Sequence, residues 1–143
     1  MDIAGAVVGV TSLSITLCDG IVSYCHAWRH QDDDVRSLSA LCETLRELLQ
    51  AIEQRVQSSQ SLDPSIVTKL NATLQESSRQ NEAILKLSQK YAAARTVNNW
   101  KDKPRELALR LIFPFEKKTL EELKTIKLAF RGNVDTALGL LNL

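Results

Sequence analysis

The first 28 residues form an apolar stretch that restricts the chain to few folds. Between Asp2 and Arg29, Asp19 is the only aspartate, glutamate, lysine or arginine. Several of the remaining polar groups are serine and threonine hydroxyls, which in a helix can donate to a carbonyl one turn earlier. A helix that is apolar around most of its circumference is buried in a core or placed in a membrane. The stretch therefore predicts a helix over about residues 3–28 with one of these two roles.

The same stretch is compatible with both a membrane and a protein core. The run Ile3–Leu17 is shorter than the roughly 20 apolar residues that a membrane span needs. A longer span would include Asp19, whose charge costs a few kcal/mol inside a bilayer. Gly5 and Gly9 form a G-x-x-x-G step, which lets helices approach closely in lipid. The alternative is a buried central helix of a bundle, in which the small residues admit close neighbours.

The rest of the chain also shows helical periodicity. Apolar residues recur every three or four positions, which predicts further helices over about 33–58, 64–95, 104–113 and 116–141. Asp63 and Pro64 provide a cap and a first helical position for the third helix. The middle of that helix is polar at Ser77 and Asn81, so this part faces solvent, contacts a partner or forms hydrogen bonds with the first helix.

These elements predict an all-α fold. No segment shows the alternation typical of a β-strand. We expect a single domain over residues 1–143, built as a bundle of four long helices plus a short helix. Short connections favour antiparallel neighbours. The apolar N-terminal helix has no polar face, so we expect it at the centre of the bundle.

The charge and cysteine content of the chain argue against several classes of function. The formal net charge of +1 argues against a nucleic-acid binder. The three cysteines are an odd number without a C-x-x-C pair, which suits a reducing cytosol. No basic segment precedes the apolar run, so we expect no cleaved secretory signal. These features predict a cytoplasmic protein.

The sequence lacks motifs for catalysis or for binding a cofactor. It has no glycine-rich phosphate loop, H-E-x-x-H motif or nucleophile elbow. His26 and His30 lie one turn apart beside Cys25, but no second cluster completes a tetrahedral metal site, and packing or capping explains them better. We therefore expect no enzymatic activity, no cofactor and no metal.

The last helix carries basic residues that could form a lipid-facing surface. Basic side chains near a membrane attract anionic lipid, each by about 1 kcal/mol. Acidic residues, including Glu121 and Glu122, are interspersed among them, so an ordinary solvated face is the alternative. The candidate lipid-facing residues are Lys117, Lys118, Lys124, Lys127 and Arg131.

The order of several segments resembles a known family. The segments are the opening Met1–Ile15, the run Cys18–Tyr24 with Trp28, the apolar stripe Leu38–Leu49, the run Leu111–Leu120, and Asn133–Leu138 near the C-terminus. Together they resemble the HeLo-like, or HELL, domain found at the N-terminus of fungal STAND (NLR-type) proteins. The resemblance covers essentially the whole chain.

The resemblance implies a helical bundle related to the HeLo domain and to the N-terminal bundle of the mixed-lineage kinase-like executioner. It implies a membrane-targeting cell-death effector of a fungal immune or heterokaryon incompatibility system. Oligomerisation would release the N-terminal helix, and the protein would move from the cytoplasm to the plasma membrane. The implied partners are a second copy of the chain, membrane phospholipids and an upstream NLR or amyloid-signalling protein, without nucleic acid. The chain shows no nucleotide-binding module, repeats or amyloid motif, which leaves the trigger open.

Two functions therefore remain in view. In the first, the N-terminal helix is buried at rest and enters the membrane after activation. The residues expected to insert or to pack in lipid are Ile3, Gly5, Val7, Val8, Gly9, Val10, Leu13, Ile15 and Leu17. In the second, the bundle is a non-toxic signalling or adaptor domain that mediates homo- or hetero-oligomerisation. In that case the same residues serve the core.

Overall fold

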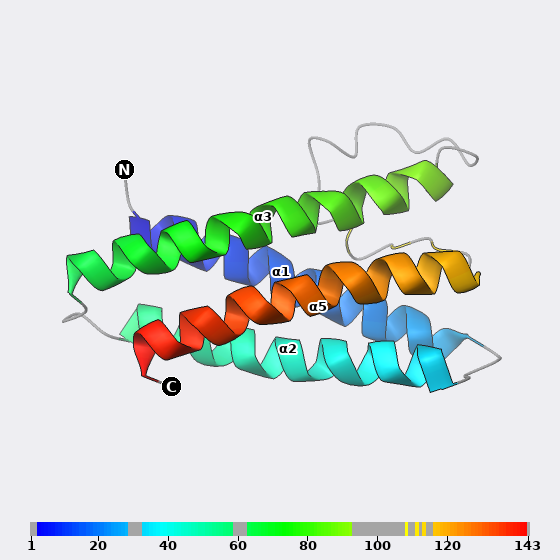
Figure 1. The fold of residues 1–143 in the computed structure, drawn as a ribbon, viewed down its shortest axis with the longest axis horizontal. Helices are drawn as coiled ribbons and strands as arrows, with labels where there is room; N and C mark the ends of the chain where they lie inside the picture. The colour runs from blue at the N-terminus through cyan, green and yellow to red at the C-terminus, as the bar shows by residue number, and fades with distance from the viewer. Residues whose placement is uncertain are drawn as a thin grey trace.

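The fold is all-α. The computed structural model describes residues 3–28, 33–58, 63–92 and 116–142, together with the single positions 108, 111 and 113. Within these residues there is no strand, and four long helices account for almost all of them (Figure 1). They are α1 (Ile3–Ala27), α2 (Asp33–Ser58), α3 (Pro64–Ala92) and α5 (Lys117–Leu141). The predicted fold class is confirmed.

The helix bounds agree closely with the periodicity of the sequence. Asp63 caps α3 as predicted, because its Oδ1 accepts a hydrogen bond from the backbone N–H of Ser65 at 2.9 Å. The same bond lowers the pKa of Asp63. The predicted end of the third helix, residues 93–95, falls beyond the described range. Of the predicted short helix, Ala108 is helical, whereas Leu111 and Phe113 are not, and the other positions of 104–113 are not described.

The four helices form a ring in which the backbones of the diagonal pairs are not in contact. Within the described helices, α1 and α5 each contact both α2 and α3, whereas α1 does not contact α5 and α2 does not contact α3 through their backbones. Figure 1 shows α1 antiparallel to α2, and α3 antiparallel to α5. The other two neighbouring pairs, α1 with α3 and α2 with α5, run parallel. These two pairs are not joined by short connections, so the antiparallel expectation does not apply to them. They are neighbours because α2 and α3, although consecutive, occupy opposite corners.

The core is built from one stripe of each helix. The stripe of α2 follows steps of three and four residues from Val35 to Val56. The stripe of α1 includes Val7, Leu17 and Ile21, all with at most 1% of their surface exposed. The expected central position of this helix is wrong. Among the described helices its backbone contacts α2 and α3, so it occupies a corner of the ring. Ala108 and Leu111 also lie against it at Gly20, and Phe113 lies against it at Tyr24.

The outer face of α1 consists of small residues. Gly5, Gly9 and Ser23 are exposed. A Cβ added to Gly9 would meet no atom within 4 Å, whereas a Cβ added to Gly20 would collide with the carbonyl oxygen of Ala108. Glycine is therefore required for packing at position 20, where the chain near residue 108 crosses α1, and is not required at position 9.

This difference yields a matched pair of substitutions. Gly9→Ala should raise the free energy of unfolding by about 0.5–1 kcal/mol, since alanine favours the helix and fits without contact. Gly20→Ala should lower it by about 1–3 kcal/mol, because the added methyl overpacks the contact with Ala108. Urea denaturation followed by circular dichroism measures both. Equal effects at the two positions would contradict this assignment.

Candidate functional site: the contacts of the N-terminal helix

In the bundle, the predicted membrane-inserting residues differ in how much of their surface is exposed to solvent. Val7 and Leu17 are fully buried. Gly5 and Gly9 are exposed, and the side chain of Ile3 is not described. The half-buried members are Val8, Val10, Leu13 and Ile15. The G-x-x-x-G step therefore faces away from the neighbouring helices and serves no helix contact within the bundle.

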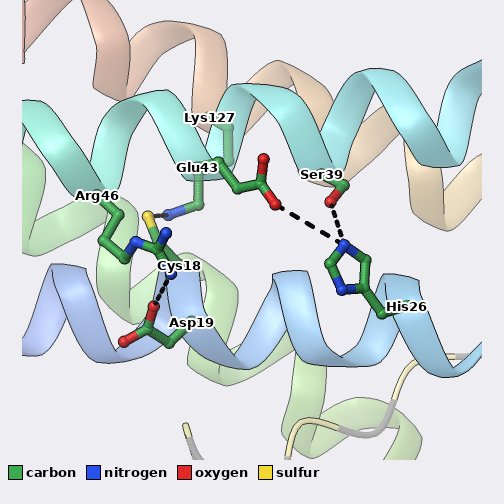
Figure 2. A network of polar contacts seen from close by, with 7 residues as sticks. All are labelled: Cys18, Asp19, His26, Ser39, Glu43, Arg46 and Lys127. Atoms are coloured by element: carbon green, nitrogen blue, oxygen red, sulfur yellow. Dashed lines mark hydrogen bonds and ion pairs between the residues drawn. The ribbon is translucent and has the colours of Figure 1, made fainter.

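Polar side chains of α1 and α2 form contacts along the edge of the interface between the two helices. Figure 2 shows Arg46 of α2 donating to Asp19 Oδ1 of α1 at 3.0 Å. This bond raises the pKa of Arg46. Closer to the start of α1, the hydroxyl of Thr11 donates to Glu53 Oε2 at 3.3 Å. Asp19, the residue that interrupts the apolar run, thus has an interhelical partner in the bundle.

A third contact lies at the end of α1. His26 Nε2 is 3.4 Å from Ser39 Oγ and 3.7 Å from Glu43 Oε1 (Figure 2). These residues line a cavity of about 160 Å³ between the two helices, together with Cys25 and Arg36. Because the cavity is small and half open, it does not resemble a site for a cofactor, which needs roughly 300 Å³ or more.

The interface between α1 and α3 is polar and incompletely hydrogen-bonded. Asn81 Nδ2 donates to Ser14 Oγ at 2.8 Å, which confirms that the polar middle of the third helix contacts the first. However, Asn81 Oδ1 and the hydroxyls of Ser77 and Ser88 are buried without a hydrogen-bond partner. Each such buried polar group costs about 1–3 kcal/mol. This interface is therefore weaker than its buried area suggests.

A lysine lies at the centre of the bundle. Lys127 of α5 is fully buried, and its Nζ donates to Cys18 Sγ of α1 at 3.4 Å, across the diagonal of the ring (Figure 2). The same Nζ lies 4.9 Å from the ring centroid of Phe130. The placement of Lys127 on a lipid-facing surface is wrong, because its position belongs to the buried stripe between Leu123 and Phe130.

Cys18 of α1 and Cys42 of α2 are both fully buried, and Cys18 lies beside this lysine. Hydrogen bonding from Cys42, together with the nearby positive charge of Lys127, lowers the pKa of Cys18 to about 6. The same bond and burial raise the pKa of Cys42 well above its ordinary value. Sequence reasoning missed this cluster. Its signal is a lysine at a core position of an otherwise apolar stripe, with cysteines at core positions of two other helices.

The remaining candidate basic residues lie on or near the surface of α5. Lys117 and Lys118 are exposed, while Lys124 and Arg131 are half-buried. Arg131 forms an ion pair with Asp135 at 3.0 Å, which offsets its charge. The basic surface is thus smaller than predicted and partly neutralised.

Two further properties bear on function. The segment Gly5–Ala27 is long and apolar enough to cross a membrane, and 39% of its apolar window is buried. A core helix of a soluble protein or a signal sequence can meet the same criterion of length and composition. In the part of the chain that the structure describes, no three histidine, cysteine, aspartate or glutamate side chains are grouped to hold a metal ion.

Comparison with known proteins finds a distant relative. The chain is 27% identical over 126 residues to the azaphilone pigments biosynthesis cluster protein L of Monascus ruber. The matched region covers 87% of this chain and 26% of that protein, so the chain spans about a quarter of the relative's length. No family model matches the chain. No solved structure matches it significantly.

The cysteine–lysine cluster predicts a pH dependence of stability. Cys18 faces Cys42 of α2, Lys127 of α5 and Asp19 of its own helix. Its pKa is lower in the folded state, so stability rises with pH from about 6 towards the ordinary thiol pKa of about 9, and is lost as pH falls through about 6. The slope is at most about 1.4 kcal/mol per pH unit. Above that window the raised pKa of Cys42 reverses the trend.

Urea denaturation at several pH values measures this contribution. The Cys18→Ser variant, whose hydroxyl does not ionise, should show a flatter dependence than the wild type between about pH 6 and pH 9. Identical slopes for the two proteins would show that Cys18 does not titrate in this window.

Proposed function

We propose that this domain is a membrane-targeting effector in which α1 leaves the bundle and inserts into a lipid bilayer. The observation that carries the proposal is the mismatch between α1 and its surroundings. The helix has the length and apolar character of a membrane span, yet α2 and α3 cover one side of it. Near its start the exposed residues are Gly5 and Gly9, which are small and uncharged and suit helix packing in lipid.

The contacts of α1 favour release over permanent burial. Its interface with α3 includes Asn81, whose Oδ1 is buried without a hydrogen-bond partner. The hydroxyls of Ser77 and Ser88 on α3 are buried and unpaired as well. Its interface with α2 is bordered by half-exposed polar pairs such as Asp19–Arg46. Exposed ion pairs of this kind contribute about 0.2–1 kcal/mol each. Exposing the buried apolar side of α1 to water remains costly, at about 25 cal/mol per Å², so oligomerisation or a partner must drive the change.

The biological setting of this activity is proposed from the resemblance. It favours a cell-death effector of a fungal NLR-type immune or incompatibility system, cytoplasmic at rest and located at the plasma membrane when active. The proposed partners are further copies of the chain, phospholipids and an upstream NLR or amyloid-signalling protein. The name of the Monascus ruber relative refers to a pigment biosynthesis cluster and states no molecular activity.

Release of dye from anionic liposomes tests the proposal. Arg46→Ala removes the α1–α2 ion pair and should increase the rate of leakage about two- to fivefold, as expected for an exposed pair. Arg79→Ala is the matched control, because it removes the same charge from a pair confined to α3. Its leakage rate should equal that of the wild type.

The same assay distinguishes the effector function from the adaptor function. Each protein is assayed alone and fused to a trimeric coiled coil, which imposes oligomerisation. Absence of leakage from every version, with circular dichroism showing folded bundles, would contradict the effector proposal and favour a signalling or adaptor domain.

A further inference from the structure

The inner stripe of α3 has the spacing of a coiled-coil seam. From residue 70 to residue 88 its buried positions follow alternating steps of four and three residues, which is a heptad pattern. The stripe consists of Leu70, Leu74, Ser77, Asn81, Ile84 and Ser88. The positions of the same spacing in α2, from Val35 to Val56, are all apolar, so spacing alone reflects the packing of the bundle. The stripe of α3 differs because half of its positions are polar.

The polar atoms of this stripe are not all hydrogen-bonded in the bundle. Asn81 Nδ2 donates to Ser14 of α1, whereas Asn81 Oδ1 has no partner. The hydroxyls of Ser77 and Ser88 have no partner either. The three side chains have at most 1% of their surface exposed. Because buried polar groups in native proteins are nearly always paired, three unpaired groups on one stripe point to a second state in which they have partners.

Departure of α1 changes what this stripe can bind. The N–H of Asn81 that donates to Ser14 becomes available, and it is the donor that the Oδ1 of a second Asn81 lacks. A serine hydroxyl both donates and accepts, so Ser77 and Ser88 can also pair with their counterparts in another copy. Groups that are complementary to themselves fit a contact between two identical chains.

We propose that α3 is the self-association helix of the open state, and that it pairs in parallel and in register with α3 of a second copy. The proposal rests on the proposed release of α1, which uncovers the side that Asn81 faces. Ser77 lies four positions before Asn81, and Ser88 lies seven positions after it. Because these separations differ, only a parallel, in-register pair brings each polar residue opposite its counterpart. An asparagine at such a core position sets register and oligomeric state in coiled coils.

The residues that flank the stripe allow two copies to approach. Charges at flanking positions determine which helices of a coiled coil pair. The flanking residues of α3 are all uncharged: Asn71, Thr73, Ser78, Gln80, Leu85 and Leu87. The charged residues between positions 70 and 88 lie on the exposed side of the helix, at Glu76, Arg79, Glu82 and Lys86. Two identical copies of α3 therefore bring no like charges together at the seam.

The pairing is weak enough to depend on the location of the chain. Only half of the stripe is apolar, so the pair buries little apolar surface. At rest, α1 and α5 both pack against α3. Collecting the chains on a membrane raises their local concentration, which favours a weak contact. Pairing is therefore expected on liposomes and not in dilute solution.

Disulfide crosslinking of the full chain on anionic liposomes tests the pairing. Ser77→Cys and Ser88→Cys are nearly isosteric changes at positions that are buried at rest. Oxidation with copper phenanthroline should link each variant to itself, with about tenfold more product on liposomes than in solution. In a mixture of the two variants no link should join position 77 to position 88, because these positions lie about 16 Å apart along the helix. Mass spectrometry identifies the linked peptides.

Charges placed beside the stripe provide matched variants of the Ser77→Cys protein. In a parallel pair, position 73 of one helix lies next to position 78 of the other. Thr73→Glu with Ser78→Glu brings like charges together and should lower the yield of the link about two- to tenfold. Thr73→Lys with Ser78→Glu brings opposite charges together and should restore the yield. Both positions are half-buried, and circular dichroism establishes that each variant is folded.

Other outcomes would overturn the proposal. Dye release without a link between the two copies of position 77, links from position 77 to position 88, or equal yields from the two charge variants would contradict the pairing of α3 and leave the proposed function standing. Absence of both dye release and links would contradict the release of α1 and, with it, the pairing. A link at position 77 without dye release would support the pairing, contradict membrane insertion and favour the adaptor function.

Discussion

The structure depends on the way α1 is covered. A helix that is apolar or small around most of its circumference is placed at a corner of a ring, where two neighbours cover one side. Val7 and Leu17 take part in the core, while Gly5 and Gly9 face outward. The bundle thus buries the inner stripe and leaves the face with Gly5 and Gly9 exposed. The proposed membrane activity follows from this unused face.

The polar contacts of α1 set how readily it can leave. Asp19 would be costly in a bilayer, and in the bundle it pairs with Arg46 at the surface. On the other side, Asn81 and its neighbours on α3 are buried with incomplete hydrogen bonding. At the centre, Lys127 reaches Cys18 from α5 across the ring. The helix is therefore held by a few specific polar contacts in addition to its buried apolar stripe.

Sequence periodicity predicts the helices well and their arrangement less well. The bounds of α2 follow directly from steps of three and four residues, because that stripe has a polar face opposite it. The position of α1 could not be predicted in the same way. A helix without a polar face gives no signal about which side is covered, so its expected central place was wrong. The diagonal placement of α2 and α3 likewise depends on contacts distant in sequence.

The cysteine–lysine cluster shows a second limit. Lys127 lies on the buried stripe of α5. Because lysine is rarely buried, its charge led to the prediction of a surface position. Its partner Cys18 is 109 positions away in the sequence, and only the folded ring brings the two together. Contacts between residues so distant in the sequence depend on how the helices are arranged, and the local pattern of apolar residues does not specify that arrangement.

The most direct test of the account uses a probe on the outer face of α1. Gly9→Cys can be labelled selectively with an environment-sensitive fluorophore, because the three native cysteines are buried and position 9 is exposed. On anionic liposomes the account predicts a blue-shifted emission that lipid-attached quenchers reduce and aqueous quenchers do not. An emission unchanged from that in solution, with full quenching by aqueous iodide, would show that α1 stays in the bundle and contradict the account.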